Sequence, residues 1–392
     1  MTAETRNRQA DAPRSEARVV RVDETHLDAL VRFYRRVWDR EADSATVREA
    51  RAREAESNPA APGEDVPTFL FMLGDEAVGH LGTIPTRLWC GSSERPAHWL
   101  HGLWVLPEHR NGPIGFLLVR EAVSQLALAM SVVVEPAPRR LFEAQGFHDY
   151  GPIPNFVRLI RPARVLDRLD PVATGLVKLP DWIAGAVRSA QNMGGGRLAG
   201  ATLAGATRLW TAAGRSTGLR VERDWPIDSE LLDDLWRRMR GGLQAAASRD
   251  GPMIIDRYPA GEESPYRVVS LWLDDTLAGL AVLRVPGPSP DARLAGVNLA
   301  VLCEIVYPLG QPDCGLAVVS AAVDVAANLG ADALLCTASH RAVPALLRRA
   351  AFVPLPGNQH FMIRDAEGRS DCPTDLGDWW LTRGDSKADS AF

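Results

Sequence analysis

Cysteine is scarce in this sequence, with five among 392 residues, and the five are widely scattered. None belongs to a CxxC pair or to another spacing typical of zinc sites, and nothing suggests a small disulfide scaffold. We therefore expect no metal centre, and reduced thiols in a cytoplasmic protein. The cysteines are Cys90, Cys303, Cys314, Cys336 and Cys372.

An excess of positive charge is also absent, because 44 Lys and Arg residues face 49 Asp and Glu residues, for a net charge of -5. A chain with this balance has no general attraction for nucleic acid, so we expect no nucleic-acid partner. The charge balance does not indicate an oligomeric state.

Long apolar runs are missing as well. Residues 1–18 contain no apolar core of the kind that a secretory signal needs. The stretch 172–190 is interrupted by Lys178, Pro180, Asp181 and Arg188, so we expect no integral membrane segment there. We interpret it as a connector packed between domains, with an amphipathic helix on a membrane surface as the alternative.

The chain is long enough for two domains, and one order of predicted elements occurs twice along it. The first half has predicted strands at 19–22, within 68–90 (two), and at 98–107, 131–136 and 156–162, with helices at 27–38, up to 58, after 114 and at 138–147. The second half has a helix at 229–243, a hairpin at 266–285, strands at 299–309, 331–339 and 359–365, and helices at 314–330 and 344–352. This repetition predicts the duplication of a ~150-residue α/β unit.

The composition sets the expected boundaries of these units. We expect a disordered polar tail at 1–17, a first domain at 18–162 and an Ala- and Gly-rich helical linker at 163–216. A second domain at 217–366 and a C-terminal tail at 367–392 follow. In that tail, Trp379 and Trp380 either dock onto the core, which we favour, or stack on a sugar.

The most informative stretch is VLPEHRNGPIGFLLVREAV, residues 105–123. An apolar run ends at Pro107, a polar loop with two glycines follows, and apolar residues then recur at helical spacing. A helix that begins after such a loop offers free backbone N–H groups and a favourable dipole to an anion. The pattern therefore predicts an anion site where this strand leads into the helix.

The loop LPEHRNGPIG resembles the pyrophosphate loop of the GNAT superfamily of acyl-CoA-dependent N-acyltransferases. Arg110 and Gly115 match the first and last positions of that motif, and Pro113 stands where its middle glycine is expected. The resemblance implies two tandem GNAT-like domains, each a twisted, mostly antiparallel α/β mixed sheet flanked by helices, with acetyl-CoA or another acyl-CoA as cofactor. Proline removes one N–H donor. The amides expected to hold the phosphates are those of Asn111, Gly112, Ile114 and Gly115.

A second motif, EPAPRRLFEAQGF, resembles the family segment whose tyrosine often protonates the departing thiolate. Here Phe142 stands at the tyrosine position, so we place it against the cofactor but without a proton to donate. Water or another group then serves as the acid, or this half performs little chemistry.

The resemblance also implies that a backbone N–H of Trp104 or Val105 faces the thioester carbonyl. On the same strand, His101 lies where many relatives carry a glutamate, and imidazole is suited to proton uptake near neutral pH. His101 is our candidate for the general base, and a histidine with a structural hydrogen bond is the alternative.

The second half matches the motifs poorly. Gln311 and Gly315 stand in its loop and Leu347 at its tyrosine position, so we expect a degenerate copy that shapes the acceptor cleft. Glu304 is its candidate catalytic residue, with three possible roles: a base for the acceptor amine, the partner of an arginine, or a solvated strand residue.

These expectations favour an N-acyltransferase, with acetyl as the expected acyl group, that acts by direct attack of a small-molecule amine or an amino sugar. A catalytically inactive tandem protein that serves in binding or assembly is the alternative from another class. An aminoacyl transferase of related fold that uses charged tRNA is a third hypothesis, which the acidic charge balance disfavours.

Overall fold

The computed structural model describes residues 16–39, 41, 43–58, 60–133, 136–168, 220–222, 227–288, 296–368 and 371–386. The first half contains β1 (Ala17–Arg21), α1 (Leu27–Trp38), α2 (Ser44–Glu56), β2 (Thr68–Leu73), β3 (Glu76–Cys90), β4 (Ser93–Val105), α3 (Ile114–Gln125), β5 (Leu128–Val133), α4 (Pro136–Ala144), β6 (His148–Leu159) and α5 (Pro162–Arg168). Most of the expected tail at 1–17 and of the expected linker at 163–216 lies outside the described residues.

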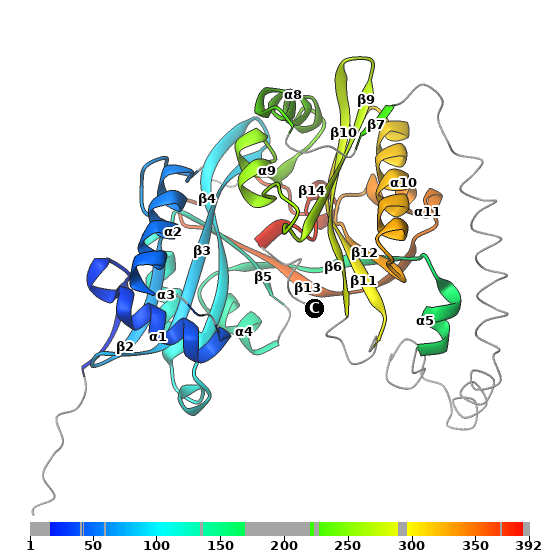
Figure 1. The fold of residues 1–392 in the computed structure, drawn as a ribbon. Helices are drawn as coiled ribbons and strands as arrows, with labels where there is room; N and C mark the ends of the chain where they lie inside the picture. Colours follow the sequence, from blue (N-terminus) through cyan, green and yellow to red (C-terminus); the bar gives the residue numbers. More distant parts are fainter. Residues whose placement is uncertain are drawn as a thin grey trace, which may run out of the picture.

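The second half repeats much of this order (Figure 1). It contains β7 (Arg220–Glu222), α8 (Ser229–Arg240), β8 (Ala245–Ala247), α9 (Gly251–Arg257), β9 (Tyr266–Leu273), β10 (Thr276–Pro288), β11 (Asn298–Val306), α10 (Pro312–Asn328), β12 (Ala333–Thr337), α11 (Val343–Arg349), β13 (Val353–Asp365) and β14 (Trp379–Trp380). The mixed α/β sheet flanked by helices confirms the expected fold class. The sequence pattern did not predict β7, β8, α9 or β14.

Aspartates define the starts of three helices. Asp43 accepts a hydrogen bond from the Thr46 amide at the start of α2, and Asp228 and Asp250 cap α8 and α9 in the same way. Each carboxylate satisfies an N–H group that the first turn leaves without a partner and lies at the positive end of the helix dipole.

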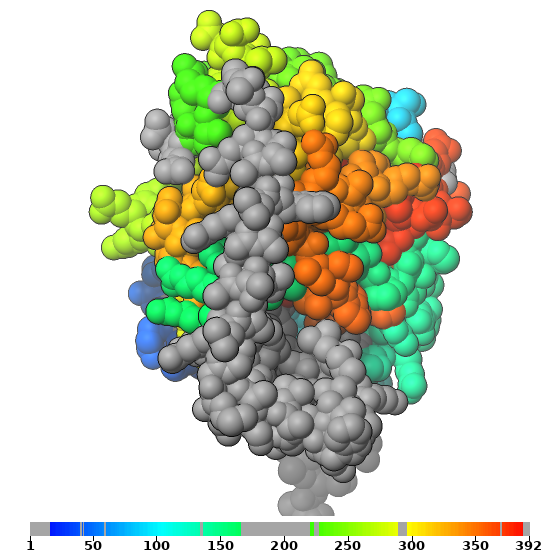
Figure 2. Space-filling model, turned by 90° about the vertical axis from the view of Figure 1, so that its right-hand side faces the viewer, coloured from blue at the N-terminus to red at the C-terminus, as the bar shows by residue number. Residues whose placement is uncertain are grey.

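One continuous sheet joins the two halves, in the order β1-β2-β3-β4-β5-β13-β6-β12-β11-β10-β9-β7. Two strands, β6 of the first half and β13 of the second, lie next to strands of the other half. Antiparallel β13 separates β5 from β6, and β6 pairs with β12 on its other side. Figure 2 shows the consequence, with first-half atoms in teal directly beside orange atoms of the second half.

Helices cover both faces of the first-half sheet. Successive residues of β3 point to opposite faces, because side chains alternate along a strand. A methyl group built on Gly79 would meet Ile114 and Leu118 of α3, whereas His80 stacks on Phe33 of α1. Thus α3 packs on one face of β3 and α1 on the other.

The C-terminal segment is docked onto the junction of the halves, as we favoured. Trp379 and Trp380 are fully buried, and β14 pairs with β8, which in turn pairs with β3. The Trp379 ring packs on Phe361 of β13 with centroids 4.8 Å apart, and Phe361 also contacts Trp99 of β4. Large aromatic surface buried in this way stabilises the junction.

The expectation of reduced thiols is wrong for one pair of cysteines. Cys90, at the end of β3, forms a disulfide with Cys372, and their Cα atoms are 5.4 Å apart. The two residues are 282 positions apart in the sequence, so no local spacing indicated the bond. The other three cysteines are buried and form no disulfide.

We call the insertion of β13 between β5 and β6, and of β6 between β13 and β12, the strand exchange. It predicts that the first half does not fold by itself. A fragment of residues 16–168 keeps β6 but removes both of its neighbours, β12 and β13, and leaves β5 with an open edge. We expect it to unfold without the sharp urea transition of the full chain, as followed by tryptophan fluorescence. A cooperative, native-like transition of the fragment would contradict this prediction.

Candidate functional site

The strands β4 and β5 separate in the middle of the sheet. They pair in parallel only from His98 to Leu100 of β4, and the Ser131 hydroxyl donates to the Leu100 carbonyl at this last pair. Beyond it, β4 continues to Val105 with β3 as its paired neighbour. The backbone of residues 101–105 therefore borders an opening in the sheet on its β5 side.

A bulge bends β4 at this opening. The pairing with β3 shifts between Gly82 and His80, which face His101 and Trp104, so β4 carries an extra residue there. Gly102 supplies it with a φ of 61°, a left-handed conformation that glycine adopts without strain.

The buried His80 holds the bulge, a role that sequence reasoning missed. Its Nδ1 lies 2.8 Å from the Gly102 carbonyl oxygen, which makes Nδ1 the donor, and its ring packs among Phe33, Tyr34 and Trp38 of α1. A histidine within an apolar strand sequence carried no signal that would distinguish it from a core residue.

The loop after β4 leads directly into α3, as predicted. Pro113 is the N-cap, and Ile114 and Gly115 lie in the first turn, where N–H groups have no acceptor within the helix. The Gly112 amide, however, donates to the His109 carbonyl at 3.2 Å and so is used inside the loop. The loop thus offers fewer amides to an anion than the four we expected.

Arg110 folds back over the end of β4. Its Nε donates to the Val105 carbonyl at 3.0 Å, and its guanidinium lies over the Trp104 ring, 4.8 Å from the centroid. Trp104 is 39% exposed, so this cation–π pair forms a surface beside the opening in the sheet.

Phe142 lies in the first-half core. It is buried, and its ring makes an edge contact with Phe147, with centroids 4.9 Å apart. Its neighbour Leu141 approaches Gly115 so closely that a methyl group built on the glycine would lie 3.1 Å from Leu141 Cδ1. Gly115 thereby allows α4 to pack against the first turn of α3.

A cavity of about 350 Å³ lies on the α1 and α2 side of β3 and β4. His101 lines it, and a methyl group built on Gly82 would come within 2.7 Å of the His101 Nε2 atom. The opposite wall comes from the second half, through Met253, Asp256 and Arg257 of α9. Figure 1 shows α9 between β3 and β4 on one side and the β9–β10 hairpin on the other.

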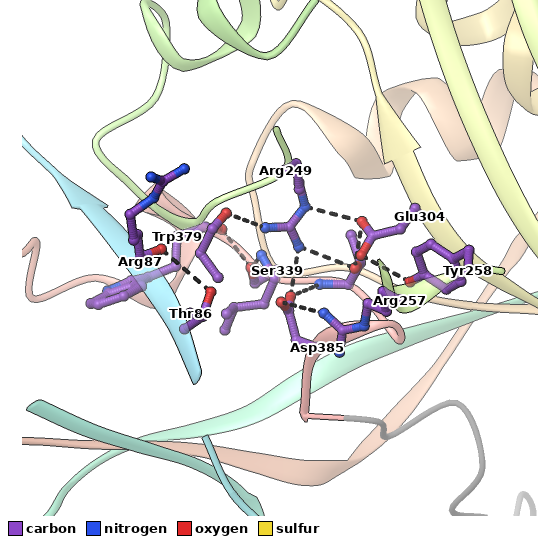
Figure 3. Close-up of polar contacts among 12 residues, drawn as sticks. Thr86, Arg87, Arg249, Arg257, Tyr258, Glu304, Ser339, Trp379 and Asp385 are labelled. Atoms are coloured by element: carbon purple, nitrogen blue, oxygen red, sulfur yellow. Dashed lines mark hydrogen bonds and ion pairs between the residues drawn. The ribbon is translucent and has the colours of Figure 1, made fainter. Parts of the chain in front are cut away.

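Glu304 lies elsewhere, in a buried ionic network (Figure 3). The Arg249 Nε donates to Glu304 at 3.0 Å, and the Arg249 Nη2 donates to Asp385 at 2.7 Å. The hydroxyls of Tyr258 and Thr382 also donate to Glu304, each at 3.1 Å. Of the three roles that we considered, the structure shows the partner of an arginine, and the side chain is not solvated.

Burial and charge act in opposition in this network. Burial raises the pKa of Glu304, and the Arg249 guanidinium partly offsets that effect. Burial works against the charge of Arg249 too, but Asp385 and Glu304 together raise its pKa. The guanidinium is therefore charged at neutral pH, and its buried charge depends on both carboxylates.

The backbone closes tightly around the same network. A methyl group built on Gly384 would lie 2.1 Å from the Tyr258 hydroxyl and 2.6 Å from Glu304 Oε1, so only glycine fits there. The Gly384 amide donates to the Cys303 carbonyl of β11 at 2.8 Å. The network thus joins the C-terminal segment and β11 to the end of α9, a helix whose residues Met253, Asp256 and Arg257 line the cavity.

No group of His, Cys, Asp or Glu side chains among the described residues is arranged to hold a metal ion. Within the same part of the chain, no helix has the length and apolar character needed to cross a bilayer.

Comparisons with known proteins find similar structures but no similar sequence. No protein-family model matches the chain, and no curated protein matches it. A GCN5-related N-acetyltransferase from Anabaena variabilis has a TM-score of 0.54 and 10% identity over 90% of this chain and 73% of that one. A probable N-acyltransferase from Enterococcus faecalis has a TM-score of 0.56 and 10% identity over 91% of this chain and 74% of that one.

Saccharomyces cerevisiae N-myristoyltransferase, solved with bound myristoyl-CoA and inhibitors, has a TM-score of 0.53 and 12% identity over 93% of this chain and 85% of that chain. Identities at this level establish a shared fold and nothing finer. The chain therefore has the fold of GNAT N-acetyltransferases and N-myristoyltransferases, as the resemblance of its loop motif implied.

The ionic network predicts a large loss of stability in a Glu304→Gln variant. Glutamine keeps the shape but removes the charge, which leaves the buried Arg249 with one carboxylate partner. We expect the free energy of unfolding to fall by about 3–5 kcal/mol. Urea denaturation measures it, with the exposed Glu49→Gln as the matched control. A variant that is as stable as the wild type but has lost acyl transfer would instead identify Glu304 as a base.

Proposed function

We propose that this protein is an acyl-CoA-dependent N-acyltransferase that transfers an acyl group directly to an amine. The observation that carries the proposal is the opening between β4 and β5, which lies between the first turn of α3 and the cavity that holds His101. Solved proteins of this fold are N-acyltransferases, one of them with bound myristoyl-CoA. Acetyl-CoA is the acyl donor we propose, and the acceptor is a small amine or an amino sugar.

The residues present suit a CoA pyrophosphate at the start of α3. The unused first-turn amides of Ile114 and Gly115 donate to it together with Asn111, while Gly112 serves the loop itself. Trp104 and Arg110 then border the acyl-bearing arm. A bound acyl-CoA would supply an activated thioester, and the backbone N–H of Trp104 or Val105 would stabilise negative charge on its carbonyl oxygen.

His101 is the general base in this proposal. The acceptor enters from the α1 and α2 side, where His101 lines the cavity, and the imidazole takes the proton of the attacking amine. His80 is a positioning residue, because its bond to Gly102 fixes the bulge next to His101. Phe142 has no proton to donate, so we assign protonation of the leaving thiolate to solvent.

The second half contributes the cavity wall through α9, and in this proposal that wall shapes the acceptor cleft. The domain boundaries at 162 and 217, and the duplication itself, remain proposals. So does the cytoplasmic location.

A non-catalytic binding protein is the second candidate function. Two observations favour it, the buried phenyl ring of Phe142 at the position of the family tyrosine and the internal use of the Gly112 amide. An aminoacyl transferase has no specific observation in its favour.

Substitutions at Gly115 test the pyrophosphate site. Both Gly115→Asp and Gly115→Asn place a side chain near Leu141, but only the aspartate adds negative charge at the amides. We expect CoA to raise the melting temperature of the wild type and of the asparagine variant, and the aspartate variant to lose this protection. Calorimetric titration gives the affinities. If CoA protects both variants equally, the CoA phosphates do not bind at this loop.

Removal of the imidazole tests the base. We expect His101→Ala to lower kcat for amine acylation by about 10²–10⁴-fold while CoA binding is retained, because proton transfer contributes on that scale. Thiol release measures the rate, and His148→Ala, at an exposed position of β6, is the control. Full activity of His101→Ala would show that this histidine is not the base and has a structural role. Saturable CoA binding by a wild type that acylates no amine would favour the binding protein.

A further inference from the structure

Arg257 is a buried cation at the end of α9 that the proposed chemistry does not use. Its side chain is 13% exposed and lines the same cavity as His101. Among the described residues it donates no hydrogen bond, and its Nη2 atom is buried without a partner. The nearest carboxylate oxygen is Asp385 Oδ1, 4.0 Å from Nη1, toward which the guanidinium is directed in Figure 3.

This arrangement places at the cavity wall a guanidinium that donates no hydrogen bond to any described group. A guanidinium has five N–H groups, stays protonated, and loses free energy when its donors are buried without acceptors. Asp385 supports the charge of Arg257, but its Oδ2 accepts from Arg249 and from the Thr382 amide, and its Oδ1 lies 4.0 Å from Arg257 Nη1, beyond hydrogen-bond distance. An anionic oxygen in the cavity would supply an acceptor to a guanidinium that no group in the described part of the chain hydrogen-bonds.

The other charged groups of the cavity limit what such an anion can be. Glu54 of α2 and Asp256 of α9 line it as exposed carboxylates, and Ser57 donates to Asp256 at 3.3 Å. These carboxylates attract an ammonium group and repel a ligand with a large negative charge. A ligand with one amine and one anionic group complements both kinds of charge.

We propose that Arg257 binds a carboxylate or phosphate group of the acceptor, so that the protein acylates small amines that carry one anionic group. The cavity of about 350 Å³ suits a compound of that size. This inference rests on the proposed N-acyltransferase function. It makes Arg257 a specificity-determining residue, supplied by the second half to a site whose base lies in the first.

Matched acceptors test the inference with the full-length wild-type protein. Small amines with a carboxylate are compared with their primary amides, and aminoalkyl phosphates with the corresponding amino alcohols, with acetyl-CoA as donor and thiol release as the readout. We expect kcat/KM to favour the anionic member of at least one pair by about tenfold to a hundredfold, mostly through KM. The pair that shows this preference distinguishes a carboxylate from a phosphate.

Two variants connect that preference with Arg257. Arg257→Gln is expected to remove the preference for the anionic acceptor, and Arg257→Lys to retain part of it because the charge remains. Urea unfolding of both variants shows whether α9 stays folded without the contact to Asp385. If Arg257→Gln unfolds, the wild-type pairs still decide the question, because their comparison needs no variant.

The possible failures are separable. Equal acylation of both members of every pair would overturn the role of Arg257 and leave the N-acyltransferase function intact. A preference that persists undiminished in folded Arg257→Gln would assign the recognition to another residue. If the wild type binds CoA but acylates no amine of either kind, the proposed function fails, and this inference fails with it.

Discussion

The exchange of β6 and β13 is the constraint on which the rest of this structure depends. Each of these strands lies beside strands of the other half, since β13 runs between β5 and β6 of the first half and β6 runs between β13 and β12 of the second. Backbone hydrogen bonds along these strands fix the halves in register, because a slip of one residue would turn every side chain to the opposite face. A cavity built from both halves requires this kind of fixed relation.

The buried network around Arg249 stabilises one wall of that cavity. Its two carboxylates come from β11 and from the C-terminal segment, and Tyr258 adds a hydrogen bond directly after the end of α9. A helix of seven residues has little stability by itself. The cap at Asp250, the ion pair of that residue with Arg87 of β3 and the network at the other end hold it in place. The long C-terminal segment therefore has a structural role close to the site.

The proposed chemistry divides between the two faces of the sheet. The first turn of α3 suits an anion on one face, the cavity with His101 lies on the other, and the opening beside residues 101–105 lies between them. Two reactants that approach from opposite faces would meet at the bulge that Gly102 forms and His80 holds. In this proposal the second half adds selectivity through Arg257, while the first half provides the reacting groups.

The sequence by itself determined the features that depend on neighbouring residues. Periodicity placed the principal helices and strands, and the run from Arg110 to Gly115 indicated both the loop and the fold. The sequence did not show the exchange of strands, the disulfide between Cys90 and Cys372, or the roles of His80 and Arg257. Those features depend on residues far apart in the chain that only the folded sheet brings together, since hydrogen bonding and burial act between neighbours in space. Local patterns therefore predicted the elements, and the tertiary structure decided which side chains share a site.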